Sequence, residues 1–506
     1  MQPVPPVPSV MGTQHPDNVS PVPFGDSPRV GRDLEGEEVL YNIAELGMPE
    51  IMIDYERKHG EATPLWDWLH RCPTCLEERV IGRDFRVTPR LPNPDADRDD
   101  PYFWQGLGIF PNSVLVMGRM GLQGPAFTEF IIPDAARGRT LARIELHLVE
   151  RWRLLRAQYA AYADETPIPW DGAFFVQGIP LIETVERLLD PRPLWRELIA
   201  ERRRLLGRDT TIQRSFIARS DPALKAGMTA ALVAAAVALA RGRDFEDETG
   251  VAVPQIVGIG SAPFRGGLTP EPERLDRVLA TYPGAATVTV QSAFRYDHPA
   301  EVVRHAVRDL GRRVERGWNN RARLPRGPDR EETGELRKLL NRLKEAYEAS
   351  FRELAPWLER IAPHVPSHRE RYTQTALTGE VRRVGGLPAV RAIRFAASCY
   401  SLGVPPGALG FRVWDDLGES GRDLILRWVP RLEEWMREEL RWAAPEPLPG
   451  LPLIAADLAA ARTFAGSLDP DGEHAGRVAE IRRLLALPER LPEGILAAGR
   501  VRRFLG

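Results

Sequence analysis

Residues 255–267 have the sequence QIVGIGSAPFRGG. Its first part, residues 255–259, is a short, mostly apolar run beside glycine, a pattern that predicts a buried strand of a parallel sheet. The string then places Arg265 directly before Gly266 and Gly267. Because glycines lack side chains, backbone N–H groups there can approach a bound anion. The stretch therefore predicts a strand followed by an anion-binding turn, with the Arg265 side chain facing a cavity.

Other short apolar runs beside glycine or proline predict further buried parallel strands, at residues 114–117, 129–132, 173–177 and 286–291. Stretches with apolar residues at helical spacing lie around them, at residues 36–47, 64–76, 140–162, 184–206, 222–241, 300–314, 331–361, 423–443, 455–465 and 476–487. We expect the helix at 184–206 to break near Pro191 and Pro193. Strands that alternate with helices indicate the α/β class. The excess of helix predicts a (β/α)8 TIM-type barrel with large additional helical insertions.

The chain length of 506 residues allows one elaborated domain or two. Residues 1–23 are proline-rich, and we expect them to form an N-terminal arm that packs on the body of the protein. We expect residues 24–506 to form a single elaborated barrel domain with a helical C-terminal part. No repeat of fixed period is visible.

Composition excludes several classes of protein. Lys and Arg number 68 against 70 Asp and Glu, which gives a net charge of -2 and favours neither nucleic acid nor an anionic membrane as a partner. The most apolar stretch, residues 226–240, is shorter than the roughly 20 residues of a membrane span, so we expect a buried helix. The absence of a signal-peptide pattern and the low cysteine content predict a cytoplasmic protein.

We interpret Cys72 and Cys75, a lone CxxC pair, as structural, with a redox or zinc half-site as the alternative.

A second unusual string, TQHPDN, occupies residues 13–18. It groups an imidazole, two amides and a carboxylate around Pro16. A proline restricts the residue before it to extended or turn conformations, so the backbone of His15 is constrained. This arrangement suits a histidine that is directed at a ligand.

In a TIM barrel, functional side chains lie at the carboxyl ends of the strands and in the loops that follow. Arg265 follows the predicted strand at 255–259, and Gln291 ends the one at 286–291. Glu183 follows the run at 173–177 after a short apolar segment. These three side chains are therefore expected at one end of the barrel.

The strings at 13–18 and 263–267 resemble the TQHPDN-like and PFRGG-like motifs of the archaeal-type phosphoenolpyruvate carboxylases. Further segments resemble that family in the expected order, at residues 52–58, 88–94, 289–297 and 400–406. The matches extend from His15 to about Gly410, which is most of the chain.

The resemblance implies a divalent metal site, for Mg²⁺ or Mn²⁺. Glu183, in the string IPLIETV, and Asp221, in RSDPALKAG, match the metal-binding carboxylates of the wider superfamily. Without the resemblance, Asp221 before Pro222 would be a helix N-cap and Glu183 an ordinary surface carboxylate. Bacterial and plant enzymes have a catalytic lysine where this chain has Leu224, so the neighbouring Lys225 receives no role.

The resemblance also implies a set of site residues. Arg90 lies between prolines in a TPRIPNP-like string, and Arg382 matches a GYSR-like arginine. Arg391 matches an LPRAI-like arginine, although another register would place Ala389 there. The implied catalytic residues are His15, Arg90, Arg265, Arg382 and Arg391, and the implied substrate-binding residues are Arg265, Gly266, Gly267 and Gln291.

The family's activity would be the irreversible carboxylation of phosphoenolpyruvate with bicarbonate, which gives oxaloacetate and phosphate through carboxyphosphate and an enolate. In this chemistry His15 would accept the proton of carboxyphosphate, since an imidazole titrates near ~6.5. The family also implies a homotetramer, with the helices at 331–361 and 423–443 as contact surfaces.

Two other functions remain as alternatives. One is another barrel enzyme that uses phosphoenolpyruvate, such as a mutase, lyase or kinase, although the chain lacks the GxxxxGK[ST] string of a nucleotide-phosphate loop. The other is a non-catalytic relative that keeps the fold and binds a ligand. The complete set of His15, Glu183, Asp221 and Arg265 argues against the second alternative.

Overall fold

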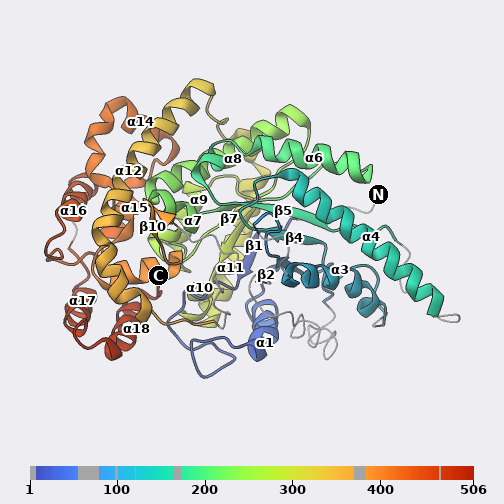
Figure 1. The fold of residues 1–506 in the computed structure, drawn as a ribbon, viewed down its shortest axis with the longest axis horizontal. Helices are drawn as coiled ribbons and strands as arrows, with labels where there is room; N and C mark the ends of the chain where they lie inside the picture. The colour runs from blue at the N-terminus through green and yellow to red at the C-terminus, as the bar shows by residue number, and fades with distance from the viewer. Residues whose placement is uncertain are drawn as a thin grey trace.

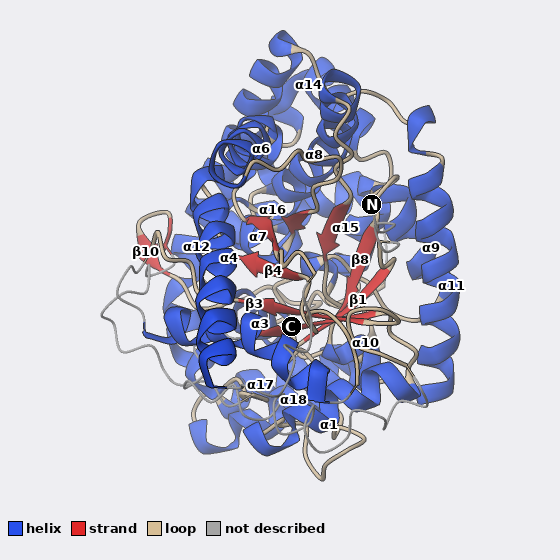
Figure 2. Ribbon diagram, turned by 90° about the vertical axis from the view of Figure 1, so that its right-hand side faces the viewer, coloured by secondary structure: helices blue, strands red, loops and turns tan. Residues whose placement is uncertain are grey.

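The structure is a computed structural model that describes residues 7–54, 79–96, 101–119, 121–162, 172–369, 383–466 and 469–506. Its centre is a closed barrel of eight strands, which helices surround (Figures 1 and 2). The strands are β1 (Val10–Thr13), β2 (Glu50–Asp54), β3 (Arg86–Arg90), β4 (Glu129–Ile132), β5 (Gln177–Ile182), β6 (Ser215–Ala218), β7 (Gln255–Gly258) and β8 (Thr287–Val290). The predicted TIM-type barrel is confirmed.

Each strand pairs in parallel with the next in sequence, and β8 pairs with β1 to close the barrel. In the closing register Val10 faces Val288 and Gly12 faces Val290. Because every strand runs in the same direction, all the carboxyl ends meet at one end of the barrel. Any side chain that follows a strand is thereby brought towards that end.

The barrel interior is layered. Its middle is apolar, filled by Met11, Met52, Ile131, Ile179, Leu181, Phe216, Ala218 and Ile256. Nearer the amino ends of the strands lies a charged layer, in which Arg214 donates to Glu50 at 2.8 and 2.9 Å and to Glu129 at 2.8 Å. Arg214 also donates to Thr287 at 3.1 Å. These four side chains come from the even-numbered strands or the residue before them, which matches the alternate-strand layering of TIM barrels.

The helices are α1 (Glu35–Leu40), α3 (Pro101–Arg119), α4 (Gly138–Tyr162), α5 (Val185–Leu189), α6 (Arg192–Leu206), α7 (Ser220–Ala226), α8 (Met228–Thr249), α9 (Pro272–Thr281), α10 (Ser292–Tyr296), α11 (Ala300–Asn319), α12 (Arg330–Ile361), α13 (Ala392–Ser401), α14 (Gly418–Trp428), α15 (Leu432–Leu440), α16 (Pro452–Ala465), α17 (Gly472–Leu484) and α18 (Leu491–Arg502). A π-helical turn, Tyr41–Glu45, continues α1. The additional helices α12 and α14 to α18 gather on one side of the barrel, and the C-terminal end of the chain lies near them in Figure 1. The predicted helical insertions are confirmed.

The first strand corrects the prediction for the N-terminal segment. Residues 1–23 were expected to form an arm that packs on the body of the protein. Instead, Val10–Thr13 is a barrel strand between β8 and β2. Four residues among prolines show too little alternation or length to identify a strand by periodicity.

Several predicted elements differ from the structure. Residues 114–117 lie inside α3, and the strand expected at 173–177 begins only at Gln177 and runs to Ile182. The helix expected at 222–241 is two helices that meet at Gly227, whose φ of +87° interrupts the helical backbone. The helix at 423–443 is likewise divided into α14 and α15. Strands β2, β3 and β6 were not predicted, and the helix at 64–76 lies outside the described residues.

The break near Pro191 is confirmed, because α5 ends at Leu189 and α6 begins at Arg192. The apolar stretch at 226–240 lies mainly in α8, most of whose residues are buried, as predicted.

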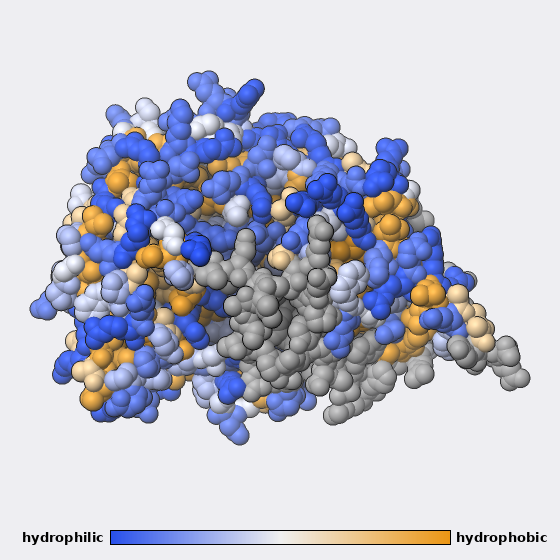
Figure 3. Space-filling view, in the orientation of Figure 1, coloured by the Kyte–Doolittle hydropathy of each residue, from blue (hydrophilic) through white to orange (hydrophobic). Residues whose placement is uncertain are grey.

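In the described part of the chain, no helix combines the length and apolar character that crossing a membrane requires. Polar residues cover much of the face of the molecule that Figure 3 shows, with apolar residues scattered among them.

Candidate active site

Polar side chains gather where the strands end. His15 lies two residues after β1, Asp54 and Arg90 end β2 and β3, Glu183 follows β5, Asp221 is in the first turn of α7 after β6, Arg265 follows β7, and Gln291 follows β8. Since all these strand ends belong to one parallel barrel, the predicted side chains share its carboxyl end.

Arg265 connects four segments of the chain. Its Nε donates to Ser220 Oγ at 3.1 Å, and its Nη1 donates to Asp17 Oδ2 at 3.1 Å and to the backbone oxygen of Gly506 at 2.7 Å. Its Nη2 donates to the side-chain oxygen of Gln291. The side chain is only 1% exposed, so the cavity-facing arginine expected from the sequence is instead enclosed by protein groups.

Asp17 is the acidic partner of this arginine. Its Oδ1 accepts the backbone N–H of Ala293 at 2.7 Å, and its Oδ2 accepts that of Ser261 at 3.3 Å. Burial lowers the pKa of Arg265, while the carboxylates of Asp17 and Asp221 act in the opposite direction. A buried cation is costly unless opposite charge and hydrogen bonds compensate it. Asp17 therefore stabilises the charged form of Arg265.

The turn at Gly266 and Gly267 has a structural cause. Their φ angles are +125° and +62°, a region that favours glycine. A Cβ on Gly266 would lie 2.5 Å from Ile259 Cβ, and one on Gly267 would lie 2.5 Å from Trp435. Both N–H groups donate within the turn, to Pro263 and Ala262. These two amides are thus used in closing the turn, whereas the sequence had suggested them as anion donors.

The PFRGG turn is supported from the C-terminal helices. The backbone N–H of Phe264 donates to Tyr400 Oη at 3.3 Å, and this hydroxyl donates to Glu439 at 2.7 Å. Glu439 also accepts the N–H of Gly407 at 2.9 Å. Glu439 is fully buried, and burial, followed by the nearby Glu438, raises its pKa to about 7 despite these hydrogen bonds.

His15 is held by its own loop. Its Nδ1 lies 2.9 Å from Thr13 Oγ1, and its carbonyl accepts the N–H groups of Asp17 at 3.1 Å and Ser292 at 3.2 Å. When Nδ1–H donates to the threonine, the other ring nitrogen, Nε2, carries no proton. The ring is then in the tautomer that can accept a proton.

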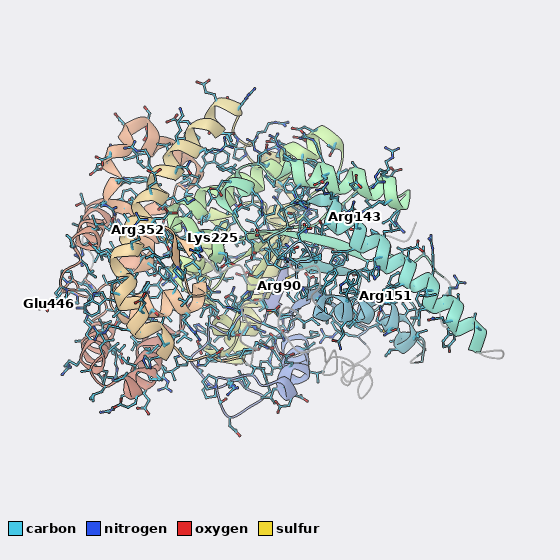
Figure 4. The ribbon with its side chains drawn as sticks, in the orientation of Figure 1. Arg90, Arg143, Arg151, Lys225, Arg352 and Glu446 are labelled. Carbon is cyan, nitrogen blue, oxygen red and sulfur yellow. The ribbon has the colours of Figure 1, made fainter. Side chains whose placement is uncertain are left out.

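Arg90 forms a two-pronged ion pair with Asp54. Its Nε donates to Asp54 Oδ1 at 3.2 Å and its Nη2 to Oδ2 at 2.7 Å, and both residues are buried. Such forked pairs fix the orientation of the guanidinium plane. Figure 4 labels Arg90 in the central part of the molecule.

The carboxylates predicted to bind metal come from neighbouring strands. β5 and β6 pair through Ile182 and Ile217, so Glu183 and Asp221 follow adjacent strand ends. In the described ranges no group of three or more His, Cys, Asp or Glu side chains could hold a metal ion. Carboxylate oxygens suit Mg²⁺ or Mn²⁺, and Mg²⁺ commonly takes one or two carboxylates with water and substrate completing its sphere. The donor set of Glu183 and Asp221 therefore fits such a metal.

The remaining predicted residues lie farther along the chain. Arg391 is the N-cap residue of α13 and is partly exposed. Arg382, like Cys72 and Cys75, falls outside the described residues. Lys225 lies one helical turn after Asp221 in α7, and Figure 4 shows it towards the C-terminal helices.

Some members of the site were missed in the sequence. Asp17, Ser220 and Asp54 all lie within strings quoted above. However, the residues around a short polar side chain do not indicate which distant residue it will bind. Glu439 had no signal, since it reaches the turn through the folding of distant helices. Gly506 ends a family-like closing string, RRFLG, but nothing in that string indicates its contact with Arg265. Only the positions of the first three inside family-like strings could have identified them.

Comparison with known proteins places this chain in a family. A family model described as phosphoenolpyruvate carboxylase matches residues 7–506. The phosphoenolpyruvate carboxylase of Methanothermobacter thermautotrophicus is 33% identical over 514 aligned residues, covering 99% of this chain and 100% of the relative. That of Halobacterium salinarum is 32% identical over 518, covering 99% of both. That of Pyrococcus horikoshii is 32% identical over 443, covering 86% of this chain and 88% of the relative.

The buried Glu439 predicts a pH dependence of stability. Its folded pKa of about 7 exceeds the ordinary value of 4.5, so the folded protein holds more protons between these values. Stability should therefore fall as pH rises from about 4.5 to about 7. Glu439→Gln should remove this contribution, so that its denaturation midpoint relative to wild type is higher at about pH 8 than at about pH 5.

The exposed Glu433, on the same helix, provides the control. Glu433→Gln should keep the wild-type pH dependence in the same denaturation series. An unchanged pH slope in Glu439→Gln would show that folding does not raise the pKa of Glu439.

Proposed function

The chain belongs to the archaeal-type phosphoenolpyruvate carboxylase family and is an enzyme of that activity, and we propose that the carboxyl end of its barrel performs the reaction. The observation that carries this proposal is the hydrogen-bonded assembly around Arg265. It brings together the strings at 13–18, 219–227 and 263–267 with Gln291. Membership in the family argues against the mutase, lyase and kinase alternatives.

The proposed reaction has two steps. A bicarbonate oxygen attacks the phosphorus of phosphoenolpyruvate, the bond from phosphorus to the enol oxygen breaks, and carboxyphosphate and the enolate of pyruvate form. Carboxyphosphate then loses its proton and divides into CO2 and phosphate. The enolate carbon attacks CO2, and this new carbon–carbon bond gives oxaloacetate.

Glu183 and Asp221 would hold the metal, Mg²⁺ or Mn²⁺. When bound, the metal supplies Lewis acidity that stabilises negative charge on oxygen. The two carboxylates contribute its charge-balancing ligands and leave room for substrate. The adjacent ends of β5 and β6 support this assignment, because they carry both side chains to one edge of the barrel.

Arg265 would stabilise the negative charge that moves from phosphate to carboxylate. Its protein partners use four N–H directions, and a guanidinium has five. These partners hold the group in place before substrate arrives, which is the condition for effective electrostatic stabilisation. Gln291 orients Arg265, and Arg90, Arg382 and Arg391 complete the proposed set of cations.

His15 would accept the proton of carboxyphosphate at Nε2. The contact from Nδ1 to Thr13 supports this role, because it orients the ring. The site must also exclude water, since protonation of the enolate would give pyruvate in place of oxaloacetate. His15 would therefore act in the second step.

Assembly and location are part of the proposal. We infer a homotetramer with contact surfaces on α12 and on α14 and α15, which have an outer face as well as a buried one. The low cysteine content supports a cytoplasmic location.

The proposed activity predicts a strict requirement for three components. Purified protein should form oxaloacetate only when phosphoenolpyruvate, bicarbonate and Mg²⁺ or Mn²⁺ are all present, as followed by a coupled malate dehydrogenase assay. The physical reason is the charge on the enolate, which two carboxylates alone cannot stabilise. Equal turnover in excess chelator would contradict the metal site at Glu183 and Asp221.

Arg265→Lys should lower turnover per folded molecule by about 10²–10³-fold, because lysine keeps the charge but loses the planar fork. It should also lower stability, since Arg265 is buried among its partners. Arg202→Lys is the control: Arg202 is equally buried and pairs with Glu145 at 2.7 and 2.8 Å, away from the proposed site. That variant should lose stability and keep its turnover per folded molecule.

The two variants separate catalysis from folding. Turnover is measured by the oxaloacetate assay and the folded fraction by circular dichroism. If Arg265→Lys retains near-normal turnover per folded molecule, Arg265 serves only the fold.

The proposed assembly predicts the mass in solution. Light scattering at assay concentration should give about four times the chain mass of 56.7 kDa. A mass of 56.7 kDa would contradict the tetramer and leave the activity unaffected.

A further inference from the structure

Gln14, beside His15, spans two parts of the fold. Its side-chain oxygen accepts the backbone N–H of Asp54 at 2.9 Å, and its side-chain nitrogen donates to Glu38 Oε2 at 2.9 Å. The residue is 1% exposed. One amide thus links the end of β1 to the end of β2 and to α1.

The charge on Glu38 determines which way this amide points. Glu38 is fully buried and also accepts from Arg369 at 2.7 and 2.8 Å and from Tyr296 at 3.1 Å. Burial alone would raise the pKa of Glu38, but Arg369 and Arg295 outweigh burial and lower it to about 2. An ionised carboxylate can only accept hydrogen bonds. The NH2 group of Gln14 must therefore face Glu38, which directs its oxygen at Asp54.

The bridge reaches two residues of the proposed site. Asp54, held through its N–H, is the two-pronged partner of Arg90. On the other side, Gln14 precedes His15 directly, and Arg295 donates to the carbonyl of Thr13. The strand end that carries His15 is consequently fixed with respect to the ion pair that orients Arg90.

We propose that Gln14 is a positioning residue, whose amide holds His15 and the Asp54–Arg90 pair in a fixed relation. This inference rests on the proposed function, because it assigns the bridge to the proton-accepting step. Gln14 need not contact substrate. Its contribution is geometric, and a misplacement of about 1 Å in a reacting group can cost about 10²-fold in rate.

The test is the ratio of pyruvate to oxaloacetate. If His15 is displaced, carboxyphosphate still forms in the first step, but capture of CO2 by the enolate becomes inefficient and more enolate ends as pyruvate. Both products come from the same folded molecules, so their ratio does not depend on how much protein is folded. Lactate dehydrogenase and malate dehydrogenase measure the two products separately.

Gln14→Met keeps the side-chain volume and removes both hydrogen bonds. We expect its oxaloacetate turnover to fall by about 10- to 100-fold and its pyruvate share to rise. Gln255→Met is the matched control, since Gln255 is 2% exposed and donates to Ala238 at 2.6 Å from the amino end of β7. This control should lose stability and keep the wild-type product ratio.

A second variant applies if Gln14→Met does not fold. Gln14→Glu retains an acceptor for the Asp54 N–H but brings a second carboxyl against Glu38. The charged and titratable groups facing that carboxyl are Glu38, Arg295, Arg369, Tyr296, Asp54 and His15. As pH rises and the introduced carboxyl ionises, repulsion from Glu38 should open the bridge and raise the pyruvate share above that of wild type.

The outcomes are distinct. Wild-type protein that forms no oxaloacetate would overturn the proposed function itself. With an active wild type, a folded Gln14→Met variant that keeps the wild-type product ratio overturns the positioning role. So does a Gln14→Glu variant whose ratio follows that of wild type across the pH range.

Discussion

The buried pair of Arg265 and Asp17 is the interaction on which the rest of this site depends. A guanidinium without solvent is stable only if opposite charge and hydrogen bonds replace water. Here the replacements come from the loop after β1, from α7, from the end of β8 and from the last residue of the chain. The arginine is therefore fully compensated only when these segments are all in place, so folding and assembly of the site are coupled.

The barrel separates this charged centre from a second one. Arg214 joins Glu50 and Glu129 near the amino ends of the strands, and an apolar layer of the barrel interior lies between the two centres. At the carboxyl ends of the strands, Tyr400 and Glu439 from the C-terminal helices support the PFRGG turn. The C-terminal part of the chain thus contributes to the proposed site, since Gly506 accepts from Arg265 and Tyr400 supports the turn that carries it.

The fold was predictable from sequence where an element is long or bounded by clear signals. The helix at 140–162, the break near Pro191 and the strand at 255–259 each carry their own pattern, and each is present. β1, β3 and β6 lack such a pattern. Four or five residues with polar members, Arg86, Thr88 and Arg90 in β3 for example, become a strand because the barrel pairs them on both sides.

For the site, the sequence by itself determined that Glu183, Arg265 and Gln291 follow or end apolar strand-like runs, and they lie at the carboxyl end because the strands are parallel. His15 and Asp221 join them through β1 and β6, two strands that the sequence did not reveal. The tertiary structure alone decided their partners. Asp17 and Arg265 are 248 residues apart, and the amides of the glycine turn are used within it. A local sequence pattern indicates the periodicity of a helix or strand and the residues at which it is interrupted. Hydrogen bonds between distant segments depend on how the whole chain packs, so no local pattern predicts them.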